Sequence, residues 1–469
     1  MQRRLAPPSP LRPSTRTRAA HWLVPLAAAA TLAGCASAPR AQPPEAAPAP
    51  AHAAPAVPPP QPAVPPPAAI SSAPPPPLVQ DTAAPAVSPE EAAAAEQADF
   101  TAWIAAFTQE ALAAGIRPDT VQTALAGAQL QQRVIELDRA QPEFTRTPWA
   151  YLDSAVSAQR IAQGQAKRAE YAVPLEAAAA RYGVPASIVT AIWGMESNYG
   201  GNFGTFRAVD ALATLGFEGR RAQWARNELL AALRILDQGD IAADRMIGSW
   251  AGAMGHTQFL PSVFLAYAVD ADGDGRRDIW GSIPDVASST ANYLASSGWR
   301  SGQPWGIEVQ LPPGFDHARA ENTVRQSSAQ WTAEGVVAID RQPLPDLGAA
   351  YVIAPAGARG PAFLVGDNFR SILRYNNSVN YALAVGLLAR QIEGGTGVVA
   401  PWPRDFQPLS RSQVKDLQTA LNQRGFSAGT ADGVMGPATR AGLRQFQQSI
   451  GVVADGYPTL ELLQRLMAP

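Results

Sequence analysis

Apolar residues recur every three or four positions along most of the chain between residues 95 and 240, which is the spacing of amphipathic helices. The stretch "FTAWIAAFTQEALAAGI" (100–116) predicts a helix that ends near Gly115. The stretch "PLEAAAARYGVPASIVTAIWGMESNYGG" (174–201) predicts two helices, separated by Gly183-Val184-Pro185. A further helix is predicted by "RRAQWARNELLAALRILDQG" (220–239), with Gly239 closing it. This part of the chain should therefore be helical.

The pattern changes between residues 303 and 366, where short apolar runs are separated by proline and glycine. These runs are "IEVQL" (307–311), "GVVAI" (335–339), "AAYVIA" (349–354) and "AFLV" (362–365). Their length, alternation and β-branched residues are typical of strands, and they predict a small strand-bearing subdomain. Helical spacing then returns over residues 368–392.

A linker at 396–408 precedes a separate C-terminal pattern. Ser410 and Gln413 have the spacing of a helix capping box, and Pro437 suits the first turn of a second helix. Apolar stripes predict three helices over 409–469, joined by "ADG" turns at 431–433 and 454–456. The predicted fold class is mainly α: a helical domain over 93–395 that contains the strand-bearing subdomain, and a three-helix module over 409–469.

The first 92 residues have no core-forming pattern. Five arginines between residues 3 and 18 precede "HWLVPLAAAATLAGC" (21–35), an apolar run too short to span a bilayer comfortably. Its last four residues resemble the lipobox of a bacterial lipoprotein signal, which implies a signal peptide over 1–35 and a lipid on Cys35. The alternative is an ordinary cleaved signal peptide with an unrelated cysteine. Residues 36–92, rich in alanine and proline, predict a disordered tether.

Charge and cysteine content narrow the function. The 469-residue chain has a formal net charge of −2 at pH 7, which gives no electrostatic basis for binding nucleic acid. Cys35 is the only cysteine, so a disulfide within the chain is impossible. Ala36 follows it where an aspartate would mark inner-membrane retention. By the lipoprotein sorting pattern, we expect a lipid-anchored protein on the periplasmic face of the outer membrane of a Gram-negative bacterium.

Glu196 is the first candidate for chemistry, because it is a lone carboxylate in an apolar run. Ile188, Ile192 and Glu196 are spaced by four and share one stripe of a helix that the glycines at 200 and 201 should stop. Burial and the negative end of the helix dipole both disfavour the ionised form, so we expect a raised pKa that suits a general acid. The alternative is a buried structural glutamate paired with an arginine.

Three motifs carry a resemblance to a known family: "AIWGMESNYGGNFG" (191–204), "DALATLGFEGRRAQW" (210–224) and "SWAGAMGHTQFLPS" (249–262). Across residues 97–393 the chain closely resembles the membrane-bound lytic murein transglycosylase B family. The resemblance implies a lysozyme-like catalytic domain that cleaves the MurNAc–GlcNAc β-1,4 bond of peptidoglycan, with Glu196 as its catalytic residue. It also implies that Glu196 acts first as acid and then as base, so that the C6 hydroxyl closes a 1,6-anhydro-MurNAc ring.

The resemblance also implies which residues contact the sugars. The residues that match these positions are Ser249, Gln258, Tyr375, Asn376, Tyr381 and Arg221. Amides and hydroxyls suit a hydroxyl-rich ligand, and aromatic rings suit sugar faces. The alternative is that the two tyrosines are core residues and that Ser249 is a cap. His256 lies in a glycine-rich turn and receives no role.

The stretch "DADGDGRRDIWG" (270–281) has the spacing of an EF-hand-type loop and predicts a structural calcium ion. Gly281 stands where the full motif has a bidentate glutamate, and by the family resemblance Asp285 supplies that ligand. The predicted metal ligands are Asp270, Asp272, Asp274, Arg276 through its carbonyl, Asp278 and Asp285. The alternative is a solvated acidic turn. No organic cofactor is expected.

The C-terminal stretch "TADGVMGPATRAGLRQFQQSIGVVADG" (430–456) resembles the three-helix peptidoglycan-binding module of wall hydrolases. The combined expectation is a lytic transglycosylase that acts on peptidoglycan glycan strands with their stem peptides and is held at a membrane by a lipid. Two alternatives remain open. One is a hydrolytic muramidase that uses water in the same cleft, and the other is a non-catalytic peptidoglycan-binding lipoprotein.

Overall fold

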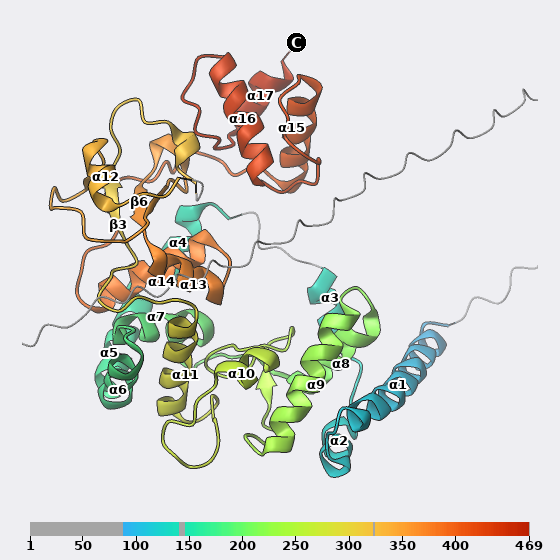
Figure 1. Ribbon diagram of the computed structural model, residues 1–469. Helices are drawn as coiled ribbons and strands as arrows, with labels where there is room; N and C mark the ends of the chain where they lie inside the picture. The colour runs from blue at the N-terminus through green and yellow to red at the C-terminus, as the bar shows by residue number, and fades with distance from the viewer. Residues whose placement is uncertain (1–87, 140–145, 322–323, 469) are drawn as a thin grey trace, which may run out of the picture. The chain divides into compact units, whose positions relative to one another are not determined.

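The computed structural model describes residues 88–139, 146–321 and 324–468 (Figure 1). Cys35, the signal peptide and most of the predicted tether lie outside these residues. The first helix, α1 (Pro89–Ala113), begins with a capping box in which Ser88 and Glu91 satisfy each other's backbone N–H groups. The helix therefore starts a few residues before 93, where the catalytic domain was expected to begin.

Helices dominate the chain up to residue 392, as predicted. After α1 they are α2 (Pro118–Leu125), α3 (Gln132–Arg139), α4 (Pro148–Ala155), α5 (Ala158–Glu170), α6 (Ala172–Tyr182), α7 (Ala186–Ser197), α8 (Ala208–Glu218), α9 (Ala222–Gln238), α10 (Pro261–Tyr267), α11 (Ile283–Ser296), α12 (Ser328–Ala333), α13 (Asp367–Tyr375) and α14 (Val379–Ile392). Gly183 and Gly239 close α6 and α9 in left-handed conformations, as their sequence positions predicted. No helix among the described residues has the length and apolarity needed to cross a membrane.

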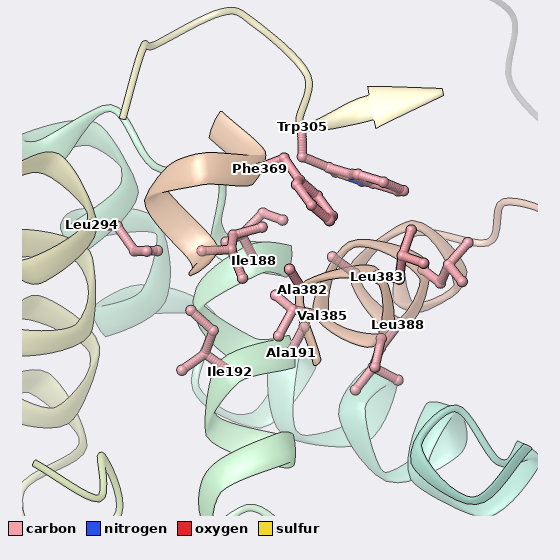
Figure 2. Close-up of a cluster of buried hydrophobic side chains, with 14 of the residues drawn as sticks. Ile188, Ala191, Ile192, Leu294, Trp305, Phe369, Ala382, Leu383, Val385 and Leu388 are labelled. Atoms are coloured by element: carbon pink, nitrogen blue, oxygen red, sulfur yellow. The ribbon is translucent and has the colours of Figure 1, made fainter. Parts of the chain in front are cut away.

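Helix α7 lies at the centre of the largest hydrophobic core. Residues 186–194 are all buried, which is the pattern of a helix covered on every side. Figure 2 shows Ile188 and Ala191 of α7 pointing toward Ala382 and Val385 of α14, and these residues belong to one buried cluster. Tight burial of residues 186–194 fixes the position of α7, and therefore the position of the carboxylate in its last turn.

The strand-bearing subdomain is confirmed. Its four strands, β3 (Gly306–Gln310), β4 (Val337–Ala338), β5 (Tyr351–Ile353) and β6 (Ala362–Val365), form an antiparallel sheet in the order β4-β3-β6-β5. A second, two-stranded ribbon pairs β1 (Phe206–Arg207) with β2 (Ile247–Gly248). This ribbon joins two segments that are far apart in the sequence and that both reach the candidate site.

The helix expected over 368–392 is two helices. Asn376 ends α13 in an extended conformation, and the Ser378 side chain caps α14 by accepting a hydrogen bond from the backbone N–H of Tyr381. Short polar side chains compete with helical hydrogen bonds, so "NNS" breaks a pattern that its apolar residues would continue. The break places Tyr375 and Tyr381 on different helices.

The C-terminal module has the three predicted helices, α15 (Arg411–Gln423), α16 (Pro437–Ser449) and α17 (Leu460–Met467). The predicted capping box of Ser410 and Gln413 is present. Its small core contains Leu417, Leu443 and Leu463. The two "ADG" turns are built alike, because a helix glutamine bonds to each one: Gln418 to Asp432 and Gln447 to Asp455.

Candidate active site

A cavity of about 450 Å³ opens at the C-terminal end of α7. Three separate segments line it: the last turn of α7, the loop that leads into β1, and the loop that follows β2. The lining residues are Glu196, Asn202, Phe203, Gly204, Thr205, Phe206, Ser249, Trp250 and Gln258. Glu196 is the one acid among them, so no second carboxylate lines the cavity within the described part of the chain.

The Glu196 carboxylate lies at the end of a buried helix with one side toward the cavity, and the residue is partly exposed. Burial raises its pKa from 4.5 to about 7, although the hydrogen bond from Tyr381 acts in the opposite direction. Within the described residues no salt bridge involves Glu196, and its pKa responds to no cation. The sequence-based expectation of a raised pKa is met, and the alternative of an arginine-paired glutamate does not describe this residue.

The residues that end α7 differ from those expected. Gly200 and Gly201 were expected to stop the helix, but it stops earlier, at Ser197. Asn198 and Tyr199 already adopt the left-handed conformation, with φ angles of 50° and 58°. Asparagine tolerates this conformation, whereas an aromatic residue rarely adopts it. The sequence therefore predicted that α7 ends in this turn, but Asn198 and Tyr199, and not the two glycines, end the helix.

Tyr381 is the direct partner of Glu196. Its hydroxyl donates a hydrogen bond to Glu196 Oε1 across 185 residues of sequence, from the first turn of α14. Tyr381 is buried, as the alternative of a core residue predicted, and it also contacts the Glu196 carboxylate. The Tyr375 hydroxyl does not donate to Glu196; it donates to the backbone carbonyl of Thr257 at 2.6 Å.

Ser249 and Gln258, both predicted from one motif, lie in the cavity wall with Glu196. The Ser249 hydroxyl accepts hydrogen bonds from the backbone N–H groups of Ala251 and Ala253, so it also shapes its own turn. Gln258 has a left-handed φ of 51°, and its amide nitrogen donates to the carbonyls of Phe203 and Gly255. These bonds hold the two loops of the cavity together.

Arg221 and Asn376 do not line this cavity. The Arg221 guanidinium pairs with buried Asp138 at 2.7 Å and lies over the rings of Trp224 and Trp250, at 4.5 and 5.7 Å from their centroids. Arg221 therefore stands behind the cavity wall and supports Trp250, which lines it. Asn376 is exposed at the end of α13.

Sequence reasoning missed the aromatic part of the wall. Phe203, Phe206 and Trp250 line the cavity and are each half-buried. Trp250 directly follows Ser249, and Phe203 lies within the motif around Glu196, so both stood inside stretches already singled out. An aromatic residue in a helical protein is more often part of the core, and only the fold shows that these rings reach a cavity.

Three acids of the predicted calcium loop come together. Carboxylate oxygens of Asp270, Asp272 and Asp285 all lie within 4.8 Å of one another. Asp285 is fully buried, and burial together with the charge of Asp272 raises its pKa. Carboxylates gathered in this way, with a buried member, fit a cation that prefers oxygen ligands.

The two remaining predicted carboxylates, Asp274 and Asp278, make separate contacts. The Asp274 carboxylate pairs with the Arg276 guanidinium at 2.8 Å, and this ion pair lowers the pKa of Asp274. Asp278 Oδ1 accepts hydrogen bonds from the backbone N–H groups of Trp280 and Gly281. The geometry thus favours three of the predicted carboxylates over the full EF-hand-type set.

Comparison with known proteins agrees with this architecture. Residues 99–390 match the family model described as "Transglycosylase SLT domain", and residues 410–466 match "Putative peptidoglycan binding domain". The membrane-bound lytic murein transglycosylase B of Escherichia coli K12 is 35% identical over 218 residues, which is 45% of this chain and 58% of that protein. The chain thus spans somewhat more than half the length of this relative.

Two solved structures extend the comparison. SltB3 from Pseudomonas aeruginosa, crystallised in complex with NAG-anhNAM-pentapeptide, is 53% identical, with a TM-score of 0.76 over 79% of this chain and 99% of its own. Slt35 from Escherichia coli, in complex with calcium, is 30% identical, with a TM-score of 0.53 over 63% of this chain and 93% of its own. The chain belongs to the family of the transglycosylase SLT domain, and it carries a C-terminal domain of the putative peptidoglycan-binding family.

Proposed function

We propose that this protein is a lytic transglycosylase that cleaves the MurNAc–GlcNAc β-1,4 bond of peptidoglycan and leaves 1,6-anhydro-MurNAc ends. The observation that carries the proposal is a single carboxylate, Glu196, with a pKa of about 7 in a cavity lined by no second acid among the described residues. Most hydrolytic glycosidases require a pair of carboxylates about 5–10 Å apart. The complex of its relative SltB3 with NAG-anhNAM-pentapeptide supports the same product.

One carboxylate is sufficient for this reaction because the substrate supplies the nucleophile. At neutral pH a large fraction of Glu196 is protonated, so it can donate its proton to the leaving glycosidic oxygen as that bond breaks. The substrate's own N-acetyl group stabilises the anomeric carbon meanwhile. The ionised Glu196 then accepts the proton of the C6 hydroxyl, whose oxygen bonds to the anomeric carbon and closes the ring. The proton taken from the C6 hydroxyl restores the acid form of Glu196, and no water is consumed.

The cavity wall suits a sugar ligand. Ser249 and Gln258 offer a hydroxyl and an amide, while the rings of Phe203, Phe206 and Trp250 offer flat apolar faces. The other predicted sugar contacts do not line this cavity. Tyr381 is proposed to act through Glu196, and Arg221 through Trp250. Tyr375 and Asn376 lie at the end of α13.

The acidic loop is proposed to hold a structural Ca²⁺ through Asp270, Asp272 and Asp285. Burial of Asp285 beside two further carboxylates supports the assignment, since a cation would offset their mutual repulsion. Slt35, a structural relative, was crystallised in complex with calcium.

The cellular location of the protein is also a proposal. The lipobox-like sequence that ends in Cys35 supports a lipid anchor on the periplasmic face of the outer membrane, and the Ala/Pro-rich stretch would let the enzyme reach the wall. The peptidoglycan-binding family of the C-terminal module supports a second attachment to the glycan.

The deciding experiment digests purified peptidoglycan with the form that lacks residues 1–35, beside its Glu196→Gln variant, with products identified by mass spectrometry. We expect anhydro-muropeptides from the wild type and none from the variant. Reducing-end products would instead indicate a hydrolytic muramidase. Equal activity of both proteins would refute the role of Glu196, and binding without cleavage by either would favour a non-catalytic wall-binding protein.

A further inference from the structure

The turn that follows Glu196 has an unusual backbone. Asn198, Tyr199 and Gly200 are consecutive left-handed residues, with φ angles of 50°, 58° and 82°. Glycine accepts this conformation without penalty, but a residue with a bulky aromatic side chain does so only where its surroundings hold it there. Such outliers gather at functional sites, and this one begins two residues after Glu196.

The Tyr199 side chain fills a space that two glycines leave open. A Cβ atom on Gly194 would lie 2.5 Å from Tyr199 Cζ, and a Cβ atom on Gly164 would lie 2.5 Å from the Tyr199 hydroxyl oxygen. Gly194 belongs to α7 itself, whereas Gly164 belongs to α5. The buried ring is therefore wedged between the helix that carries Glu196 and a neighbouring helix.

A hydrogen bond fixes the far end of this wedge. The Tyr199 hydroxyl donates to the backbone carbonyl of Arg160 on α5 at 2.8 Å. The ring also meets the Trp193 indole edge to face, with centroids 5.8 Å apart. These contacts tie the end of α7 to α5 by a route that does not pass through Glu196.

His256 holds the same turn from its other end. A Cβ atom on Gly200 would lie 2.3 Å from His256 Cε1, so the imidazole is packed directly against the turn. His256 Nδ1 accepts a hydrogen bond from Trp193 Nε1 at 2.9 Å, and the His256 backbone N–H donates to the Ile279 carbonyl. The turn is thus held by the packing of the Tyr199 ring on one side and of the His256 imidazole on the other.

This packing adds to the hydrogen bonds of the turn, in which the Tyr199 backbone N–H donates to the Trp193 carbonyl and the Gly200 N–H donates to the Ser197 hydroxyl. A second cavity, of about 410 Å³, is lined by Gln163, Ala166 and Lys167 of α5 and by the turn residues 198–201. The segment that continues from the turn, at 202–206, lines the cavity that contains Glu196. The chain after Glu196 therefore lines two cavities in succession, and the side chains packed against the turn limit how far it can shift.

We propose that Tyr199 is a positioning residue, which acts as a wedge that holds the last turn of α7 and so keeps the Glu196 carboxylate at its reacting position. The inference rests on the proposed function of Glu196. Tyr199 does not line the cavity of Glu196, and its hydroxyl is engaged by Arg160, so it acts through the backbone and not on substrate.

The test compares Tyr199→Phe and Tyr199→Leu with the wild type in kcat, KM and the pH dependence of kcat on a soluble glycan substrate. Tyr199→Phe keeps the ring and loses one hydrogen bond, so we expect roughly a fivefold lower kcat. Tyr199→Leu loses the wedge, so we expect about a 100-fold lower kcat, because displacement of a reacting group by about 1 Å has an effect of this size. KM should change less than about twofold in both variants.

The pH profile of kcat distinguishes a positioning role from a purely structural one, because a loss of stability alone would not shift its alkaline limb. Without the ring, the last turn of α7 should shift and expose more of the Glu196 carboxylate to water, which lowers its raised pKa toward 4.5, so the alkaline limb of kcat should move to lower pH. The titratable side chains that act on Glu196 are Tyr381 and, through its charge when ionised, Tyr375, and neither variant alters them.

Tyr351 is a matched control, because it is also a buried tyrosine of this domain and does not line the cavity. Tyr351→Leu should lose comparable stability but keep the wild-type kcat and pH limb in the folded protein. The proposal is overturned if Tyr199→Leu behaves like Tyr351→Leu. If Tyr199→Leu does not fold, an unchanged kcat in Tyr199→Phe overturns it instead. Full activity of Glu196→Gln would refute the proposed function separately, whatever the Tyr199 variants do.

Discussion

At the scale of single residues, Glu196 is controlled by two opposing influences. Burial at the end of α7 favours the protonated carboxyl, whereas the Tyr381 hydroxyl donates a hydrogen bond that favours the ionised form. Their balance leaves a pKa of about 7, which suits the proposed role of Glu196 in giving and taking a proton within one turnover. With burial alone the pKa would be higher still, and the carboxyl would remain largely protonated at neutral pH.

This balance predicts the pH dependence of the reaction. The wild-type kcat should fall above pH 7, because the proposed first step requires a protonated Glu196. Tyr381→Phe removes a donor to the ionised carboxylate, so the pKa of Glu196 should rise and the alkaline limb should move to higher pH by about one unit. The measurement is a pH profile of kcat for both proteins.

The matched control is Tyr293→Phe, since the Tyr293 hydroxyl donates to the Arg374 carbonyl and not to Glu196. Its alkaline limb should coincide with that of the wild type. A limb that moves to lower pH in Tyr381→Phe would contradict the role of Tyr381 as a donor to the carboxylate.

At the scale of elements, the short β1–β2 ribbon brings the two cavity loops together. Phe206 pairs with Gly248 across the ribbon, so residues 202–206 and 249–250 meet beside Glu196. The approach is close at Gly204, where a Cβ atom would lie 1.9 Å from the Gly248 carbonyl oxygen. Glycine at this position is therefore required both by its φ of 102° and by the lack of space.

The Gly204→Ala variant should lose stability and substrate binding together. The left-handed backbone and the clash should together lower the free energy of unfolding by roughly 2–4 kcal/mol. Displacement of the 202–206 loop should also raise KM. The control is Gly219→Ala, because Gly219 has a similar φ of 98° but no atom within 4 Å of its would-be Cβ. Gly219→Ala should lower the free energy of unfolding by only about 1 kcal/mol and leave KM unchanged. Urea unfolding and steady-state kinetics measure the two quantities. Equal effects in both variants would count against the clash.

The acidic loop belongs to the same scale and makes a separate prediction. If Asp270, Asp272 and Asp285 hold Ca²⁺, adding calcium to chelator-treated protein should raise the melting temperature, with about 2.7 kcal/mol of stabilisation when free calcium is 100 times the Kd. Asp285→Asn should abolish this increase. Asp274→Asn should retain most of it, because Asp274 pairs with Arg276 outside the cluster. Loss of the increase in both variants would favour the full EF-hand-type ligand set.

At the scale of the whole molecule, the chain combines a catalytic domain with a module of a peptidoglycan-binding family. Two sites on one chain that bind the same polymer raise each other's effective concentration, even when each binds weakly. The module can therefore increase residence on the insoluble wall without any change in the chemistry at Glu196.

Truncation after Gln407 tests this division of roles. The shortened protein should bind intact sacculi at least about tenfold more weakly, whereas its kcat on short soluble glycan fragments should stay within about twofold of the full-length value. Co-sedimentation with sacculi and product analysis by chromatography measure the two quantities, and thermal unfolding confirms that the catalytic domain remains folded. A loss of kcat on the soluble fragments would show that the module contributes to the catalytic site itself.

The sequence by itself determined the features that depend on neighbouring residues. Apolar periodicity predicted α7, α9, the strand-bearing subdomain and the three-helix module, and the position of Glu196 at a helix end predicted the direction of its pKa shift. These features follow from hydrogen bonds and side-chain contacts within a few residues along the chain. For that reason they could be recognised without a tertiary structure.

Only the tertiary structure decided which distant residues meet. The hydrogen bond from Tyr381 spans 185 residues, the aromatic wall combines two loops joined by the β1–β2 ribbon, and Arg221 lies behind that wall. Likewise, the left-handed conformation of Tyr199 depends on packing that outweighs local preference. The physical reason is that such contacts are selected by the close packing of the whole core, which no short stretch of sequence contains.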